Sequence, residues 1–145
     1  MSGHMHFVCA ECGQKNRFPS ERPAAQARCG TCKAPLFSGH PCDIDEQRFN
    51  SIAAGDDLPV LVDVWAPWCG PCRAMAPAFE QASRALAGEV RLVKVNGDNA
   101  PGLMHAYGIQ GIPTMLLIRN GKLVDRVSGA MPAGQIVQWT RRALA

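Results

Sequence analysis

The sequence contains no apolar run long enough to cross a membrane. Its main apolar stretches, at residues 60–64, which Asp63 interrupts, and at residues 115–118, fall far short of the roughly 18 residues that a membrane-spanning helix requires. A basic segment followed by an apolar one is also missing from the first residues, so the pattern of a secretory signal is not present. We therefore expect a cytoplasmic protein that has no membrane partner.

The sequence also lacks a large excess of charge of one sign. Its 15 Lys and Arg residues and 12 Asp and Glu residues give a net charge of +3, and the charges are dispersed. Without a basic run, no nucleic-acid partner is expected. No glycine-rich dinucleotide fingerprint occurs, so we expect no nucleotide to bind the chain directly. The 145 residues are 47 % hydrophobic and 19 % charged, which is typical of a globular chain long enough to bury a core.

Cysteine is the informative residue type. Six of the seven cysteines form three C-x-x-C pairs, which are Cys9 with Cys12, Cys29 with Cys32, and Cys69 with Cys72. Chance placement would give only about 0.3 such pairs, and the two chemical reasons for them are metal binding and redox chemistry. The seventh, Cys42, has no partner in the sequence and is expected to be a small, buried or half-buried hydrophobe.

The chain divides near residue 38. Residues 1–38, which we call the ribbon, are rich in cysteine and have no long apolar period, and a turn-rich junction covers residues 33–41. Residues 39–145, which we call the sheet module, alternate between strand and helix patterns. The expected elements are a strand near 40–44, a helix over 45–54, a strand over 58–65, a helix over 70–87, a strand over 90–96, a helix over 101–107, hairpin strands over 114–119 and 122–128, and a last helix that Pro132 opens.

Local signals refine these elements. Asp43 or Asp45 is expected to cap the first helix, and Asp98 or Asn99 the third. The second helix carries a buried stripe of Met75, Phe79, Ala82 and Leu86. The order of strands and helices predicts an α/β fold, with a mixed central sheet covered by helices on both faces.

The pair Cys69 and Cys72 is placed where a buried strand gives way to a helix. The unpaired N–H groups and the dipole of a helix N-terminus favour a thiolate at the first cysteine. Cys69 is therefore the predicted nucleophile, and Cys72, one turn further and more buried, the resolving thiol. Pro71 suits the first helical turn, and Gly70 leaves the sulfur uncovered. The alternatives are a structural disulfide or half of a metal site, but the latter would need two more ligands.

Asp63 interrupts the apolar run of the central strand. A carboxyl group buried there should have a raised pKa, which makes it a plausible proton acceptor for Cys72. The alternatives are an aspartate hydrogen-bonded for structure, or one turned to solvent at a strand end. Pro113, just before another apolar strand, could be cis, as in many tight functional turns, but the residues alone do not establish this.

These residues carry a resemblance. The block Val-Asp-Val-Trp-Ala-Pro-Trp-Cys-Gly-Pro-Cys at residues 62–72 is similar to the thioredoxin family. Pro77, Lys94, Gly111-Ile-Pro-Thr114, Asn120-Gly121 and Gly129 follow in order, so that the resemblance covers about 105 residues at the separations of that family. It implies the thioredoxin fold for the sheet module.

The resemblance also implies roles for individual residues. Cys69 would attack, Cys72 would resolve, Asp63 would be the buried acid with Lys94 near it, and Pro113 would be a cis-proline beside the disulfide. The implied docking surface for an extended substrate segment consists of Trp68, Gly70, Pro71, Gly111, Ile112, Gly129 and Ala130. The dipeptide between the cysteines resembles that of the reductants in this superfamily. The implied partners are disulfide-containing target proteins and an NADPH-dependent thioredoxin reductase, and a monomer is expected.

The remaining four cysteines, Cys9, Cys12, Cys29 and Cys32, have the spacing of a zinc ribbon, because 16 residues separate the two pairs. Four thiolates form a closed tetrahedral site that is structural, and one zinc ion should hold this short segment folded. The nearby Gly13 and Gly30 are expected to let the chain wrap around the ion. Two disulfides or an iron ion are the alternatives.

A four-cysteine ribbon before such a module resembles the thioredoxin 2 type of bacteria, over residues 7–145. The expected function is that of a protein-disulfide reductase, a thiol-disulfide oxidoreductase. One alternative is a zinc-thiolate redox sensor or chaperone-like binding protein on a thioredoxin scaffold, in which oxidation releases the metal. Another is an interaction module, in which the ribbon recruits a partner.

Overall fold

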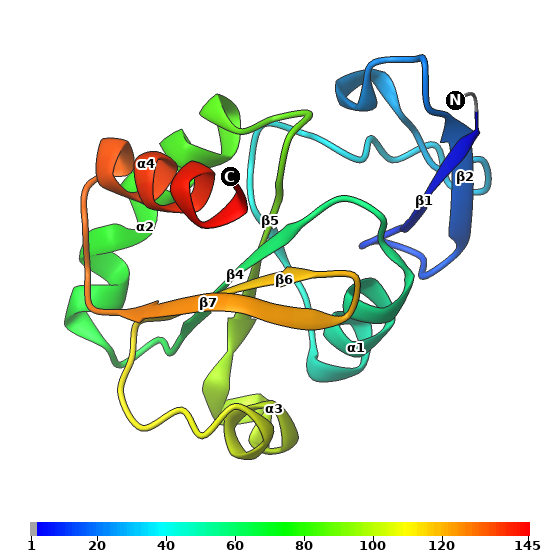
Figure 1. The fold of residues 1–145 in the computed structure, drawn as a ribbon. Coiled ribbons are helices and arrows are strands. Elements are labelled where there is room, and N and C mark those ends of the chain that lie inside the picture. The colour runs from blue at the N-terminus through cyan, green and yellow to red at the C-terminus, as the bar shows by residue number, and fades with distance from the viewer. Residues whose placement is uncertain (1–2) are drawn as a thin grey trace.

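A computed structural model describes residues 3–145. Figure 1 shows a small hairpin, β1 and β2, lying beside a larger sheet that is flanked by helices. The ribbon contains β1 (His4–Val8), β2 (Lys15–Pro19) and the short 3-10 helix η1 (Ala24–Gln26). The sheet module contains β3 (Cys42–Asp43), α1 (Glu46–Gly55), β4 (Val60–Trp65), α2 (Gly70–Ala85), β5 (Arg91–Asn96), the 3-10 helix η2 (Gly97–Asn99), α3 (Pro101–Ala106), β6 (Thr114–Arg119), β7 (Lys122–Ser128) and α4 (Ala133–Leu144).

The central sheet is mixed, as the sequence predicts. Its strand order is β3-β5-β4-β6-β7. Strands β3, β5 and β4 are parallel to one another, whereas β6 runs antiparallel to β4, and β7 antiparallel to β6. Each parallel step needs a crossover connection, and α1 and α2 supply these crossovers. The predicted order of strands and helices in the sheet module is confirmed.

Helices cover both faces of this sheet (Figure 1). Phe49 of α1 and Leu103 of α3 pack with strand side chains in one apolar cluster. Phe79 of α2 and Ile136 of α4 pack in the other. The predicted buried stripe of α2 is confirmed, because its four members are at most 2 % exposed. The apolar contact on both faces holds the middle of β4 fixed, and β4 leads directly to the C-x-x-C motif.

One of the two predicted helix caps is confirmed. Asp45 caps α1, because its side chain accepts a hydrogen bond of 2.7 Å from the Arg48 N–H. The prediction for α3 is wrong, since neither Asp98 nor Asn99 caps it. Instead, the Glu46 carboxylate from α1 accepts the N–H of Leu103 at 2.7 Å. A carboxylate from another element thus satisfies a free N–H of the first turn of this helix.

The hairpin between β6 and β7 turns at Asn120 and Gly121, as the dipeptide predicts. Both residues have positive φ, 54° and 75° respectively. Two successive left-handed residues form the turn that matches the twist of a two-residue hairpin, and asparagine followed by glycine adopts it with little strain. This hairpin places the end of β7, and with it Gly129, opposite the start of β6.

The ribbon has a small apolar core of its own. Strands β1 and β2 pair antiparallel, and the buried side chains are Phe7, Phe18, Ala27 and Leu36. Leu58 of the sheet module packs against this cluster. Among residues 3–145, no helix is long and apolar enough to cross a membrane.

Candidate active site and metal site

The C-x-x-C motif lies where β4 ends and α2 begins. Cys69 and Cys72 form a disulfide with their Cα atoms 5.2 Å apart. Cys69 is the N-cap of α2, and its Sγ accepts the N–H of Cys72 at 3.2 Å. This placement is the one predicted from the sequence. A helix N-terminus directs partial positive charge at the Cys69 sulfur, which would stabilise a thiolate there once the disulfide is reduced.

Both cysteines are buried in the disulfide form. Cys69 is 4 % and Cys72 is 2 % exposed, so the predicted difference in burial between them is small. A side chain at Gly70 would meet nothing within 4 Å. The space beside Gly70 is therefore open, although both cysteines are buried in the disulfide form.

A second segment reaches the disulfide from the start of β6. The Ile112–Pro113 peptide bond is cis, as the family resemblance implies, and Pro113 is buried. The Ile112 carbonyl oxygen lies 3.8 Å from Cys69 Sγ. Ile112 also packs against the small apolar cluster that contains Cys69 and Cys72. The fold thus brings residues 112 and 113 next to residues 69 and 72.

The implied docking residues surround this point. The Gly129 N–H donates to the Pro113 carbonyl at 2.9 Å, and its φ of 101° requires a glycine. Trp68 is 69 % exposed, which is unusual for an indole ring. The other exposed members of the set are Gly70, Pro71, Gly111, Gly129 and Ala130, whereas Ile112 is half-buried.

Asp98 lies beside the motif, although its position in the sequence predicts a helix cap. The Trp68 indole Nε1–H is directed at both carboxylate oxygens of Asp98, at 3.1 and 3.0 Å. The indole is held by this contact while most of its surface faces solvent. The sequence offers only one signal for this role, which is an acidic residue two positions after the end of β5.

Asp63 is completely buried in the centre of the sheet. Neither carboxyl oxygen has a hydrogen-bond partner among the described residues. Because side chains alternate along a strand, Asp63 shares with Leu61 the face that α2 covers. Burial raises the pKa of Asp63 to about 7, although the charge of Lys94 acts in the opposite direction. At neutral pH this carboxyl group is therefore able both to accept and to release a proton.

Lys94 is the neighbour of Asp63 on the adjacent strand, since the two residues pair in the register of β4 and β5. Its Nζ lies 4.6 Å from the centre of the Trp65 ring, in a cation–π contact. The predicted proximity of Lys94 to Asp63 agrees with this register. Lys94 moderates the cost of a buried negative charge without closing a direct ion pair.

The buried Asp63 carboxyl should make stability depend on pH. Its pKa is 3.8 in its usual state and about 7 here, so the folded chain binds this proton more tightly than the unfolded chain. The free energy of unfolding therefore falls as pH rises from about 4 to about 7. At about 1.4 kcal/mol per pKa unit, Asp63→Asn should stabilise the fold by about 2–4 kcal/mol near pH 8 and by little near pH 4. Urea unfolding at both pH values measures this, and an equal effect at both would contradict it.

The four ribbon cysteines converge in space. Their Sγ atoms all lie within 4.8 Å of one another. The Sγ atoms of Cys9 and Cys32 are 3.5 Å apart, and those of Cys12 and Cys29 are 3.6 Å apart. A tetrahedron of sulfurs about 2.3 Å from a zinc ion has edges of about 3.8 Å, so this arrangement fits zinc. The separations are too long for disulfides, and these cysteines are free thiols in the structure.

Each C-x-x-C pair of the ribbon forms the same tight turn. The N–H of Gly13 donates to the Cys9 carbonyl at 2.9 Å, and the N–H of Lys33 donates to the Cys29 carbonyl at 3.0 Å. Gly13 and Lys33 both have positive φ, 81° and 68°. The role expected of Gly30 is therefore wrong, since Lys33 occupies the left-handed position in the second turn. Lys33 Nζ donates to the Gly30 carbonyl at 2.9 Å, which helps hold that turn.

Known protein families match both modules. Residues 41–142 match the family described as thioredoxin. The chain belongs to the thioredoxin family. Residues 8–34 match the family described as thioredoxin 2, N-terminal, a zinc ribbon. Both the resemblance and the fold expected from the sequence are confirmed, and the chain is a thiol-disulfide oxidoreductase.

Individual relatives agree with this assignment. The chain is 39 % identical over 140 residues to thioredoxin C-3 of Corynebacterium nephridii, a match that covers 97 % of this chain and 96 % of that protein. It is 40 % identical over 96 residues to a thioredoxin of Haemophilus influenzae, covering 66 % and 90 % of the two chains. A solved mutant thioredoxin from Halobacterium salinarum is similar in structure, with a TM-score of 0.66, 25 % identity, and coverage of 74 % of this chain and 93 % of that chain.

Proposed function

We propose that this chain reduces disulfide bonds in other proteins. The observation that carries the proposal is the Cys69–Cys72 pair at the start of α2, with the cis Ile112–Pro113 bond beside it. An exposed Trp68 and the backbone around Gly111 and Gly129 offer an extended target segment apolar contact and main-chain partners.

The reaction would proceed in two exchanges. In the reduced protein, the Cys69 thiolate attacks one sulfur of the target disulfide, which forms a mixed disulfide and releases the other target sulfur as a thiolate. The Cys72 thiolate then attacks Cys69 Sγ, which restores the Cys69–Cys72 bond and releases the second target thiol. Two electrons pass to the target. An NADPH-dependent thioredoxin reductase would return them, because nothing in this chain is expected to bind the nucleotide.

Asp63 would assist the second exchange. Cys72 must lose its proton before it can attack, and the Asp63 carboxylate on the covered face of the sheet would accept that proton. With its pKa raised to about 7, the carboxyl group is partly ionised at neutral pH. Lys94 would limit this shift by its positive charge.

Replacing Asp63 should therefore slow exchange without removing it. We expect Asp63→Asn to lower the rate of target reduction by about tenfold or more near pH 7, since the contribution of one general base is typically 10²–10⁴-fold and water replaces part of it. Stopped-flow reduction of a disulfide substrate between pH 6 and 9 measures this. An unchanged rate and pH profile would contradict the role of Asp63.

Cys9, Cys12, Cys29 and Cys32 would hold one zinc ion as four thiolates. A closed four-sulfur site leaves no position for a substrate, so the metal would act as a structural link between the two turns of the ribbon. We assign residues 1–38 to this zinc-binding domain and residues 39–145 to the thioredoxin domain.

A second candidate function is that of a zinc-thiolate redox sensor. Cys12 and Cys32 are exposed, so an oxidant could reach two of the four sulfurs and release the metal. The two functions use different cysteines and can coexist. Loss of zinc on treatment with peroxide, accompanied by a change in client binding, would support this function.

Turnover of a protein disulfide tests the primary proposal. The wild-type chain, with its metal content measured, is assayed for reduction of insulin in the presence of NADPH and a thioredoxin reductase. Cys42→Ser is assayed beside it as the control for replacing a cysteine with serine, because Cys42 is a half-buried free thiol outside both cysteine sites. We expect turnover in both proteins. A folded, zinc-loaded chain without turnover would exclude the reductase function and favour the sensor.

A further inference from the structure

We propose that the ribbon docks on the sheet module through a buried polar interface centred on Asp56 and Arg91, and that zinc binding by the ribbon thereby stabilises the sheet module. Neither residue is a metal ligand or a part of the redox site. The proposal depends on zinc occupancy of the ribbon but not on disulfide reduction.

The interface begins with an ion pair inside the sheet module. Asp56 directly follows α1 and Arg91 begins β5, and Arg91 Nη1 lies 2.8 Å from Asp56 Oδ2. Their side chains are only 1 % and 4 % exposed. A pair this deeply buried needs hydrogen bonds at its remaining polar atoms to offset the loss of water.

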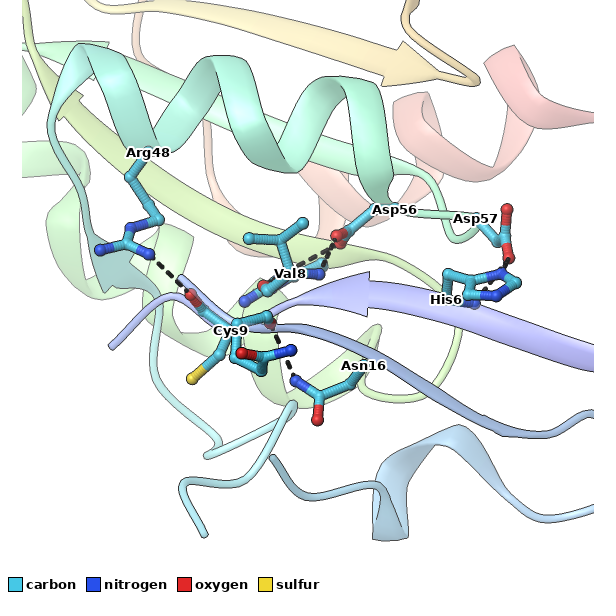
Figure 2. Close-up of polar contacts among 9 residues, drawn as sticks. His6, Val8, Cys9, Asn16, Arg48, Asp56 and Asp57 are labelled. Carbon is cyan, nitrogen blue, oxygen red and sulfur yellow. Dashed lines mark hydrogen bonds and ion pairs between the residues drawn. The ribbon is translucent and has the colours of Figure 1, made fainter. Parts of the chain in front are cut away.

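The ribbon supplies two of those hydrogen bonds through the backbone of Val8, whereas Arg91 Nε has no hydrogen-bond partner among the described residues. The Val8 N–H donates to Asp56 Oδ1 at 2.7 Å, and Arg91 Nη1 donates to the Val8 carbonyl at 2.6 Å. Figure 2 shows Val8 directed at Asp56 from the end of β1. Since Val8 immediately precedes the zinc-site residue Cys9, the same ion pair fixes the chain that leads into the metal site.

Further contacts extend the interface on both sides of Val8. The His6 N–H donates to Asp57 Oδ2 at 2.6 Å, and the Asp57 N–H donates to the His6 carbonyl at 2.9 Å. On the other side, Arg48 Nη1 donates to the Cys9 carbonyl at 3.3 Å (Figure 2). Residues 6, 8 and 9 of the ribbon are thus held by α1 and by the loop after it.

Apolar contact accompanies these hydrogen bonds. The Val8 side chain is 4 % exposed and packs in the cluster that contains Phe49 and Ile52 of α1. The approach is so close that a Cβ at Gly55 would lie 2.7 Å from Val8 Cγ2. If the ribbon moved away, the buried ion pair would lose its two hydrogen bonds to Val8, the Val8 side chain would lose its apolar contacts, and several backbone groups would lose their partners.

This arrangement couples two equilibria. Zinc needs Cys9 in place, and the docked Val8 segment helps to hold Cys9 there, together with the hydrogen bonds of the ribbon's own turn. If docking of the Val8 segment strengthens zinc binding, zinc binding must stabilise the docked state by the same free energy, because such coupling is reciprocal. A ligand that binds only this state stabilises it in proportion to its occupancy.

Gly55→Ala tests the interface without changing a charge. Gly55 is the last residue of α1 and its φ is not positive, so alanine fits the backbone and favours the helix, but its methyl group would push Val8 away. Gly134→Ala in α4 is the matched control, because a Cβ there meets nothing within 4 Å. Asp56→Asn removes the charge of the ion pair and is compared with Asp125→Asn, a change at an exposed residue of β7.

Two quantities are measured for each full-length variant. Competition with a chromophoric chelator gives the zinc affinity. Tryptophan fluorescence during heating, with and without zinc, reports the sheet module alone, since all three tryptophans, Trp65, Trp68 and Trp139, lie in it. In the wild type, removing zinc should lower the midpoint by several degrees. Gly55→Ala and Asp56→Asn should weaken zinc binding by about tenfold and reduce that shift, whereas both controls should behave as wild type.

Three outcomes would overturn the proposal. The first is a tryptophan-monitored midpoint in the wild type that does not depend on zinc. The second is wild-type zinc affinity in Gly55→Ala, which decides the matter alone if Asp56→Asn does not fold. The third is a chain that binds no zinc, which would also remove the metal assignment but leave the reductase function untouched.

Discussion

Replacing Cys69 with serine should abolish protein-disulfide reduction while leaving the fold and the zinc site intact. A serine hydroxyl at the helix N-terminus is not ionised at neutral pH and cannot form the mixed disulfide, so we expect a loss of at least about a thousandfold in rate. Insulin reduction coupled to NADPH consumption measures it. Circular dichroism and metal content serve as checks that the variant is folded and loaded.

Cys72→Ser distinguishes the two cysteines. This variant keeps the attacking thiol but cannot resolve the intermediate, so a mixed disulfide between Cys69 and the target should accumulate. Non-reducing electrophoresis with mass spectrometry would identify the sulfur involved. If Cys69→Ser instead trapped the target on Cys72 as a mixed disulfide, the assigned roles would be reversed.

Much of the sheet module could be predicted because its signals are local. The alternation of apolar strand and amphipathic helix reads directly from residue spacing, and Asn120-Gly121 specifies its own turn. The burial of Asp63 follows from its place in an apolar run, since a strand covered on both faces offers no solvent to any side chain. The position of Cys69 at a helix N-terminus follows from the strand before it and the pattern of α2 after it.

The features that could not be predicted depend on contacts between distant residues. The cap of α3 comes from Glu46, which lies 57 positions before Leu103. Asp98 has a helix-cap composition, but tertiary contact with the Trp68 indole, 30 positions away, determines its role. A composition that suits several local roles does not show which one the fold selects.

The docking interface shows the same limit more strongly. It joins Val8 to Asp56 and Arg91, which lie 48 and 83 positions after Val8. A buried arginine at the start of an apolar strand and an aspartate in a loop carry no sequence signal that they pair. The left-handed backbone of Lys33 could not be predicted either. A lysine does not favour this conformation by itself, and the turn around Cys29 stabilises it.

Removal of one zinc-site cysteine should have the second large effect. Cys29 is completely buried, and Cys29→Ser leaves three sulfurs and a weakly binding hydroxyl. Structural zinc sites contribute about 10–16 kcal/mol of apparent binding free energy, so we expect the variant to lose its zinc and the ribbon its fixed structure. Metal analysis after dialysis, together with hydrogen exchange at the amides of β1 and β2, measures both effects. Cys42→Ser, which changes a free cysteine outside the cluster, should retain zinc and protected amides.

The ribbon would unfold without metal because its own core is too small to replace it. Phe7, Phe18, Ala27 and Leu36 are the buried members of that core among the described residues, and a segment of this size does not bury enough apolar surface to offset the entropy of ordering its chain. Protected amides in a metal-free Cys29→Ser protein would show that apolar packing and docking on α1 suffice. The rate of disulfide reduction by Cys29→Ser should then be compared with that of the wild type, because β4, α2 and the start of β6 build the reductase site without any ribbon residue.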